Sequence, residues 1–184
     1  MTVGARALVA GLLFAAATAS ADPAYDRYRR PDRIVAALDL AWGMRVADVG
    51  AGDGYLSFRL EAAVGPRGRV VATDIDPAAL ATLARRAPAT SRVEVRLVVP
   101  ADPGLEAGGY DRILLAQVDH LLGDRPAYLR RLAVALAAGG RIVVVNRLTH
   151  RARLLAAVAP AGLRVVRELR DLPGQYLVTL ERAP

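Results

Sequence analysis

The chain contains neither cysteine nor lysine among its 184 residues. The lack of cysteine excludes disulfides, a thiol nucleophile and a thiolate metal site. The lack of lysine excludes the phosphate-binding motif G-x-x-x-x-G-K-S/T, and with it the P-loop nucleotide hydrolases. All 25 basic residues are therefore arginine, and they are scattered along the chain. This distribution favours a solvated surface and predicts no nucleic-acid partner.

Histidine is also scarce. Only His120 and His150 are present, and they are too few and too far apart in sequence to predict a metal site. With 54% apolar residues, a chain of this length predicts one domain with a single core.

The first 21 residues have the three parts of a secretory signal peptide. Arg6 is followed by an apolar stretch, residues 7–19, and by Ala19-Ser20-Ala21, which fits an A-x-A cleavage site. The apolar stretch is too short to span a bilayer, so we expect no stable membrane span after removal of residues 1–21. The sequence predicts an exported, periplasmic protein whose mature part, residues 22–184, is one domain. The alternative is a cytoplasmic protein that keeps this segment.

The rest of the chain is organised around three glycines. A short apolar run, residues 45–49, leads directly into Gly50, Gly52 and Gly54, and an amphipathic stretch follows. Glycine allows the φ values of a tight turn, and the missing Cβ lets a cofactor approach backbone N–H groups. Asp74 ends the next β-like run, at the spacing of an acid that accepts the hydroxyls of a ribose. The pattern therefore predicts a nucleotide-binding strand, turn and helix.

The position after the last glycine indicates which nucleotide is bound. The dinucleotide fingerprint G-x-G-x-x-G would place glycine at position 55, where this chain has Tyr55. A cofactor without a pyrophosphate is therefore favoured over NAD.

Two segments, D-V-G-A-G-D-G at residues 48–54 and T-D-I-D-P at residues 73–77, resemble the Rossmann-like class of S-adenosylmethionine-dependent methyltransferases. The resemblance covers about residues 31–184. It implies a doubly wound α/β fold with a mostly parallel seven-stranded sheet, whose last strand is antiparallel. It also implies methyl transfer from S-adenosylmethionine. The segments that could cover the site, residues 25–40 and 121–126, are short, so we expect a small or exposed acceptor. The implied cofactor-binding residues are Asp48, Gly50, Ala51, Gly52, Gly54, Asp74, Asp102 and Gln117.

Some of these acids have other interpretations. Asp48 lies inside an apolar strand, where a carboxylate is costly unless it is hydrogen-bonded, so we expect it to orient the glycine loop or the cofactor ammonium group. Asp102 resembles the acid that meets the adenine amino group, but its neighbours Pro100 and Pro103 fit a plain turn equally well. Asp76 precedes a proline and is expected to cap a helix.

Strand and helix patterns alternate along the chain, which predicts an open α/β sheet. The expected strands are residues 45–49, 69–74, 93–99, 111–117, 141–146, 163–169 and 176–181. The expected helices are residues 31–40, 56–64, 77–86, 125–138 and 150–159.

The segment after the fourth strand is where the resemblance places the transferred methyl group. Gln117 ends that strand and can hydrogen-bond a cofactor, but it cannot act as a base. His120 could take a proton from a hydroxyl nucleophile, since its unperturbed pKa of about 6.5 lies near neutrality. The alternatives are that His120 packs on the rim and that Asp119 caps a turn. We expect His150 to be a surface residue.

Two rival functions remain open. The first is an exported binding module that keeps the fold but transfers no methyl group, because a signal peptide would separate the protein from a cytoplasmic cofactor. The second is an NAD-dependent oxidoreductase, which Tyr55 disfavours.

Overall fold

A computed structural model of the chain describes Asp26 and residues 29–184. The expected signal peptide, residues 1–21, lies outside the described residues, so its cleavage and the export of the protein stay predictions.

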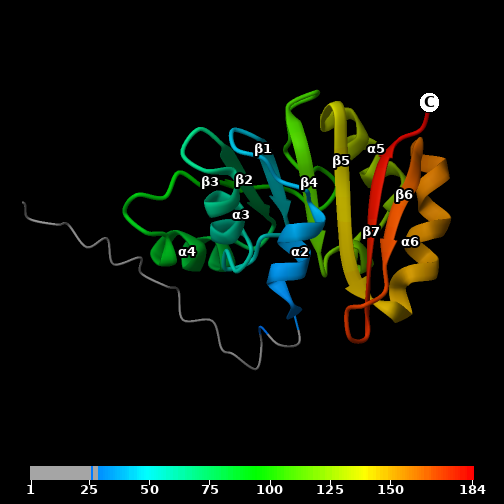
Figure 1. Cartoon of the computed structure of the whole chain (residues 1–184), viewed down its shortest axis with the longest axis horizontal. Helices are drawn as coiled ribbons and strands as arrows, with labels where there is room; N and C mark the ends of the chain where they lie inside the picture. Colours follow the sequence, from blue (N-terminus) through cyan, green and yellow to red (C-terminus); the bar gives the residue numbers. More distant parts are fainter. Residues whose placement is uncertain (1–25, 27–28) are drawn as a thin grey trace, which may run out of the picture.

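The described residues form a seven-stranded sheet with the order β3-β2-β1-β4-β5-β7-β6 (Figure 1). Strand β7 pairs antiparallel with both of its neighbours, and the other pairs are parallel. This confirms the predicted fold class, including the antiparallel last strand. The strands are β1 (Arg45–Val49), β2 (Arg69–Asp74), β3 (Glu94–Leu97), β4 (Tyr110–Ala116), β5 (Leu136–Arg147), β6 (Leu163–Leu169) and β7 (Gln175–Arg182).

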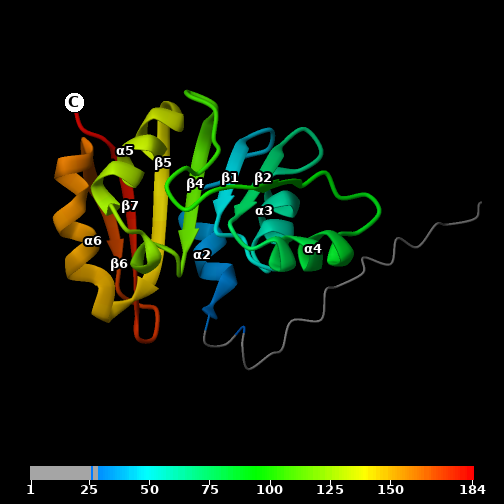
Figure 2. The ribbon, with the colours of Figure 1, turned by 180° about the vertical axis from the view of Figure 1, so that it is seen from behind.

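Helices cover both faces of the sheet. The helices are α2 (Pro31–Ala37), α3 (Ser57–Val64), α4 (Pro77–Arg86), α5 (Arg125–Ala135) and α6 (Arg151–Val158), with short 3-10 turns η1 (Asp119–Leu121), η2 (Leu148–His150) and η3 (Ala159–Ala161). Helices α2 and α3 bury apolar side chains on the face seen in Figure 1. Helices α5 and α6 do the same on the opposite face, where α5 is seen in front in Figure 2.

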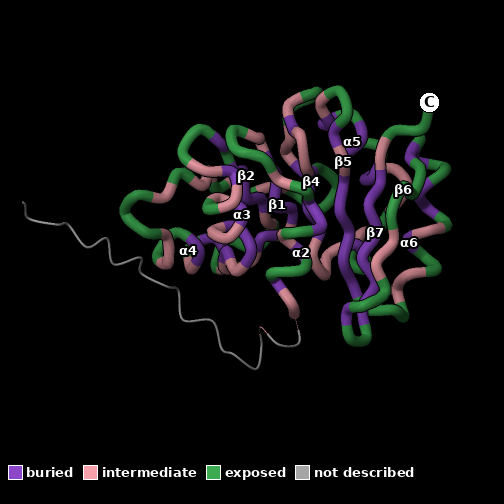
Figure 3. The backbone as a smooth tube through the Cα atoms, in the orientation of Figure 1, coloured by how far each residue is buried: buried purple, intermediate pink, exposed green. Residues whose placement is uncertain are grey.

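The central strands are apolar on both sides, as parallel strands between two helical layers must be. In β4, Ile113 packs with the α5 side of the core and Leu114 with the α2 side, and both are fully buried. Figure 3 shows this buried centre as the strands between the more exposed helices and loops.

Several predicted elements agree with the structure to the residue, and others differ by one to three residues: α2 ends at Ala37 instead of residue 40, and β3 ends at Leu97 instead of residue 99. Strands β1, β2 and β6 and helix α4 begin and end at the predicted residues. Asp76 caps α4, because its carboxylate accepts from the Ala78 N–H at 2.8 Å, which confirms the predicted cap.

The prediction is wrong at the end of α5. The helix ends at Ala135 instead of residue 138, and β5 begins at Leu136 instead of residue 141. Leu136 has extended backbone angles, is almost fully buried and pairs with Tyr110 of β4. Burial of Leu136 in the sheet therefore overrides the helical propensity of the following alanines.

The sheet order reverses its direction between β1 and β4. From β1 the chain proceeds outward through β2 and β3, and from β4 it proceeds to the other side through β5. In an open α/β sheet, the loops at the carboxyl ends of the strands separate at this switch point and leave a crevice.

Candidate functional site

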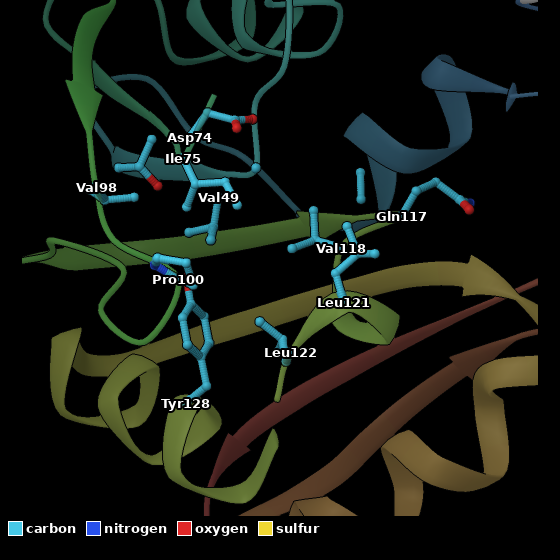
Figure 4. Close-up of a pocket in the computed structure, with 13 residues that line it drawn as sticks. Val49, Asp74, Ile75, Val98, Pro100, Gln117, Val118, Leu121, Leu122 and Tyr128 are labelled. Carbon is cyan, nitrogen blue, oxygen red and sulfur yellow. The ribbon is translucent and has the colours of Figure 1, made fainter. Parts of the chain in front are cut away.

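A cavity of about 220 Å³ lies at this switch point. Figure 4 shows the side chains that surround it, which come from the ends of β1, β2, β3 and β4 and from α5. The lining residues are Val49, Gly50, Thr73, Asp74, Ile75, Val98, Pro100, Ala116, Gln117, Val118, Leu121, Leu122 and Tyr128.

The glycine loop after β1 forms one wall of the cavity. Gly50, Gly52 and Gly54 all have positive φ values, of 73°, 57° and 84°. A Cβ on Gly50 would lie 2.3 Å from a methyl carbon of Val118, whereas a Cβ on Gly52 would meet no atom within 4 Å. Gly50 therefore allows a close approach of two loops, and Gly52 faces open space.

Ala51 and Gly54 of the same loop pack against the protein interior. Ala51 is buried against α4 and donates its N–H to the Thr73 carbonyl at 3.0 Å. A Cβ on Gly54 would lie 2.8 Å from the Leu83 side chain. Neither Ala51 nor Gly54 lines the cavity, so the structure places both where they shape the loop.

Asp74 stands opposite the glycine loop at the end of β2. One carboxylate oxygen accepts from the Gly52 N–H at 2.8 Å, and the other accepts from the Asp76 N–H at 2.9 Å. Each carboxylate oxygen has two lone pairs, so each keeps one acceptor position for a ligand. The structure thus brings Asp74 and the glycine loop together, as the sequence spacing predicts.

Asp48 lies beneath the loop and does not line the cavity. Its carboxylate is almost fully buried and accepts from the Ser57 hydroxyl at 2.7 Å. Burial raises the pKa of Asp48 to about 6, partly offset by the Ser57 hydrogen bond, and the charge of Asp74 raises it further. The contact joins β1 to Ser57, the first residue of α3. Of the two roles suggested for Asp48, orienting the glycine loop or the cofactor ammonium group, it supports the first.

The raised pKa of Asp48 predicts a pH-dependent cost to stability. Between about pH 4 and pH 6 the unfolded chain has already lost the Asp48 proton while the folded chain keeps it. The free energy of unfolding should therefore fall as pH rises through this window and stay lower above it. Asp48→Asn cannot ionise, so above pH 6 it should be more stable than the wild type, by on the order of 1–3 kcal/mol.

The measurement is urea denaturation of both proteins at a series of pH values from 4 to 8. Asp32→Asn is the matched control, because Asp32 is an exposed acid whose curve should run parallel to that of the wild type. If Asp48→Asn also ran parallel to the wild type, the burial argument would be wrong.

Sequence reasoning missed the apolar wall of the cavity. Ile75 directly follows Asp74, and its apolar side chain is 54% exposed and lines the cavity. Tyr128 of α5 also lines the cavity, and its ring points toward Pro100 (Figure 4). Burial raises the pKa of the Tyr128 hydroxyl to about 12, so it stays protonated. An aromatic residue in the first turns of a helix usually belongs to the hydrophobic core. The sequence therefore gives no signal that Tyr128 lines a cavity.

Asp102 lies outside the cavity. It borders a neighbouring hollow, where its carboxylate accepts from the Gly104 N–H at 2.9 Å and lies 3.9 Å from the Arg131 guanidinium. The turn interpretation therefore describes its contacts in this structure, and its contact with adenine stays a prediction.

Gln117 lines the cavity in a strained conformation. Its φ is 63°, which is uncommon for a residue other than glycine. Its N–H donates to the Val145 carbonyl at 2.8 Å, and its side-chain amide donates to the Gln175 side chain at 2.9 Å. Strain of this kind is often found at functional sites, where the surroundings hold it in place.

The two histidines lie together, contrary to the expectation from their separation in sequence. The His120 and His150 rings are stacked with their centroids 4.6 Å apart and their planes 17° apart. His150 is half-buried and keeps part of its surface exposed, and the sequence did not indicate that it stacks on His120. Turn η1 follows β4 and η2 follows β5, and the two turns are adjacent because these strands pair.

A buried polar network holds His120. Asn146 of β5 donates from its amide nitrogen to Asp119, and the same nitrogen lies 3.0 Å from Nδ1 of His120. Tyr176 donates its hydroxyl to Asp119 at 3.2 Å, and Arg125 donates to the Asp119 carbonyl at 2.8 Å. Asp119 is fully buried, so it does more than cap a turn.

This network fixes the tautomer of His120. The Asn146 nitrogen must be the donor, because a carboxylate can only accept and the amide oxygen already accepts from the Arg147 N–H at 2.8 Å. Nδ1 of His120 is therefore an acceptor, and the proton of the neutral ring is on Nε2. Desolvation and the neighbouring His150 lower the pKa of His120, which favours this neutral form at pH 7.

Neither a metal centre nor a membrane span is found in the described part of the chain. No group of three or more histidine, aspartate or glutamate side chains there could hold a metal ion. No helix among Asp26 and residues 29–184 is long and apolar enough to cross a bilayer.

Comparison with known proteins gives a family match. The family model described as "Methyltransferase domain" matches residues 47–142, just over half of the chain. Nocamycin O-methyltransferase of Saccharothrix syringae is 38% identical over 112 residues, which are 60% of this chain. The chain covers 40% of the length of that relative.

Solved structures share the fold. A SAM-dependent methyltransferase from Aquifex aeolicus has a TM-score of 0.80 at 21% identity, over 86% of this chain and 93% of that one. The cyclase SpnF has a TM-score of 0.70 at 15% identity, over 84% of this chain and 81% of that one. These similarities show the fold and leave the chemistry to be argued from the site.

Proposed function

Because the chain belongs to the methyltransferase-domain family, we propose that it is an S-adenosylmethionine-dependent methyltransferase that acts on a small or exposed acceptor. The single observation that carries this proposal is that Gly50 and Asp74 line one cavity at the switch point of the sheet, where the Gly52 N–H donates to the Asp74 carboxylate.

The residues around the cavity fit this cofactor. Asp74 keeps two acceptor positions for the hydroxyls of a ribose, and Gly52 leaves open space beside it. Ile75, Val98 and Tyr128 offer apolar surface for an adenine ring. Aside from Asp74, none of the lining residues is charged, so the cavity suits a ligand without phosphate groups.

When bound, S-adenosylmethionine supplies a methyl group on a sulfonium, which is already a good leaving group. The main task of the protein is then to position the acceptor in line with that methyl group and to exclude water. At the end of β4, Gln117 and the apolar side chains of Val118 and Leu121 line the cavity where the acceptor would be positioned. Little acid–base machinery is needed.

A hydroxyl-bearing acceptor is the first class to test, because the curated relative is named as an O-methyltransferase. The predicted base, His120, follows the strand end that faces the cavity, but its free nitrogen Nε2 carries a proton in the tautomer set by Asn146. His120 in this state can donate a hydrogen bond to an acceptor and cannot take a proton through Nε2. Its role as a base therefore stays a prediction that needs the other tautomer.

A second candidate is a binding module without transfer activity. It is favoured by the predicted signal peptide, which would separate the protein from a cytoplasmic cofactor, and by Gln117 at the end of β4, where an acid is usual in the resembled family. Under this alternative the cavity binds a ligand without transferring a methyl group, so binding and transfer have to be measured separately.

We expect S-adenosylmethionine and S-adenosylhomocysteine to raise the melting temperature of the purified full chain, and NAD to have no effect. A ligand at 100 times its Kd stabilises the fold by about 2.7 kcal/mol, which corresponds to a shift of roughly 5–10 °C for a chain of this size. The measurement is a thermal shift assay with each ligand, followed by a search for S-adenosylhomocysteine release with small hydroxyl acceptors.

A shift with NAD alone would overturn the proposal. A shift with S-adenosylmethionine and no release of product from any acceptor in the panel would favour the binding module.

A further inference from the structure

We propose that the acceptor carries an oxyanion, a carboxylate or a phosphate group, which is held by Arg147, His120 and His150 beside the cofactor cavity. This inference rests on the proposed function and names the substrate class for it. Arg147 ends β5, and His120 and His150 lie in the turns η1 and η2 that follow β4 and β5. We call these three residues the histidine pair site.

The histidine pair site borders the cavity directly. Leu121, the residue after His120, lines the cavity, and so do Gln117 and Val118 before it. A ligand held by the stacked rings is thus next to the strand end that faces the cofactor. The site also stays open to solvent, because His120 and Arg147 are both exposed.

Arg147 supplies positive charge to the histidine pair site. Among the residues that the structure describes, no carboxylate forms an ion pair with its guanidinium. Its two neighbouring arginines differ: Arg151 is paired with Glu168 at 2.7 Å, and Arg125 lies 3.8 Å from Asp119. Arg147 acts on His120 as a positive charge that lowers its pKa. Arg147 is exposed and follows Asn146, the residue that contacts His120. Such an arginine matches the planar, bidentate recognition of carboxylates and phosphates.

The histidines add hydrogen-bond donors. Asn146 holds Nδ1 of His120 as an acceptor, so Nε2 presents its proton outward to a ligand. His150 stacks on this ring at 4.6 Å, and Arg147 directly precedes the turn η2 that carries His150. Two other charged groups, Asp119 and Arg125, also act on His120. Asp119 is buried, and its carboxylate already accepts hydrogen bonds from Asn146 and Tyr176. The surplus charge of the cluster is therefore positive, and it is complementary to an anion.

The chain offers a direct spectroscopic test, because its only two histidines form the pair. The imidazole Cε1–H signals of the full chain report on this site alone. We would follow them in two-dimensional NMR while adding inorganic phosphate, benzoate or phenyl phosphate, with benzamide as the uncharged analogue of benzoate. We expect both histidine signals to shift together and to saturate with an anion, and not to shift with benzamide.

The variants decide whether Arg147 holds the anion. Arg147→Ala should weaken binding at least tenfold, and Arg147→Lys should restore part of it. Arg67→Ala is the matched control, because it removes the same charge at the opposite end of the sheet, in the exposed turn before β2. Comparison of benzoate with phenyl phosphate shows which oxyanion the site prefers.

Two results would overturn the inference: no saturable shift with any anion, or equal binding by Arg147→Ala and Arg67→Ala. The titration is run with and without S-adenosylhomocysteine, whose own binding is measured by thermal shift. Anion binding without any S-adenosylhomocysteine binding would overturn the proposed function and leave the oxyanion site standing.

Discussion

Replacement of Gly52 by arginine is expected to abolish binding of S-adenosylmethionine while the chain stays folded. A Cβ at Gly52 would meet no atom within 4 Å, but its φ of 57° lies in the left-handed region, which costs a residue other than glycine about 1–2 kcal/mol. The new guanidinium would fill the open space and pair with the Asp74 carboxylate, whose oxygen lies 2.8 Å from the Gly52 nitrogen. The ribose would lose both its space and its acceptor.

Gly43→Arg is the matched control for this variant. Gly43 also has a positive φ, of 88°, and a Cβ there would meet no atom within 4 Å, but it precedes β1 at the other end of that strand. Both variants should therefore melt at similar temperatures without ligand, and only Gly43→Arg should keep the shift with S-adenosylmethionine. Isothermal titration calorimetry gives the affinities. Retained affinity in Gly52→Arg would show that the cofactor does not lie against this loop.

The strands and the antiparallel direction of the last one could be predicted because local patterns and the family resemblance agree. Strands β1 and β2 are short apolar runs bounded by charged or glycine residues, and nothing in their surroundings alters their ends. The error at the end of α5 has a different origin. The alanines of residues 135–138 favour a helix locally, but the burial of Leu136 against Tyr110 is a contact between distant segments that the sequence does not display.

Contacts between distant segments also explain which residues of the site could not be predicted. The glycine loop and Asp74 could be found because their spacing along the chain is itself the signal. His150 could not be placed, since its partner His120 is brought to it only by the pairing of β4 with β5. Asn146 reads as an ordinary residue at the end of a strand, yet it determines which nitrogen of His120 carries the proton.

Asp74→Ala is expected to weaken binding of S-adenosylmethionine by about 1.5–3 kcal/mol, the range for hydrogen bonds to a charged group, or roughly 10- to 150-fold in Kd. Both carboxylate oxygens face the site from the end of β2, and both keep an acceptor position beyond their backbone contacts. The variant also releases the Gly52 N–H, so part of the loss reflects a less ordered loop. Asp74→Asn keeps one acceptor oxygen and should lose less affinity.

Asp76→Ala is the control that distinguishes an effect on cofactor binding from an effect on the stability of the fold. Asp76 is an acid two residues further on, but its carboxylate caps α4 through the Ala78 N–H. Its loss should lower the free energy of unfolding by about 0.5–2 kcal/mol and leave the Kd unchanged, whereas Asp74→Ala should change mainly the Kd. Calorimetric titration and urea denaturation of both variants measure the two quantities. If the two variants weakened binding equally, the affinity would depend on the order of the whole segment from Asp74 to Asp76, and the direct contact of Asp74 with the ribose would be refuted.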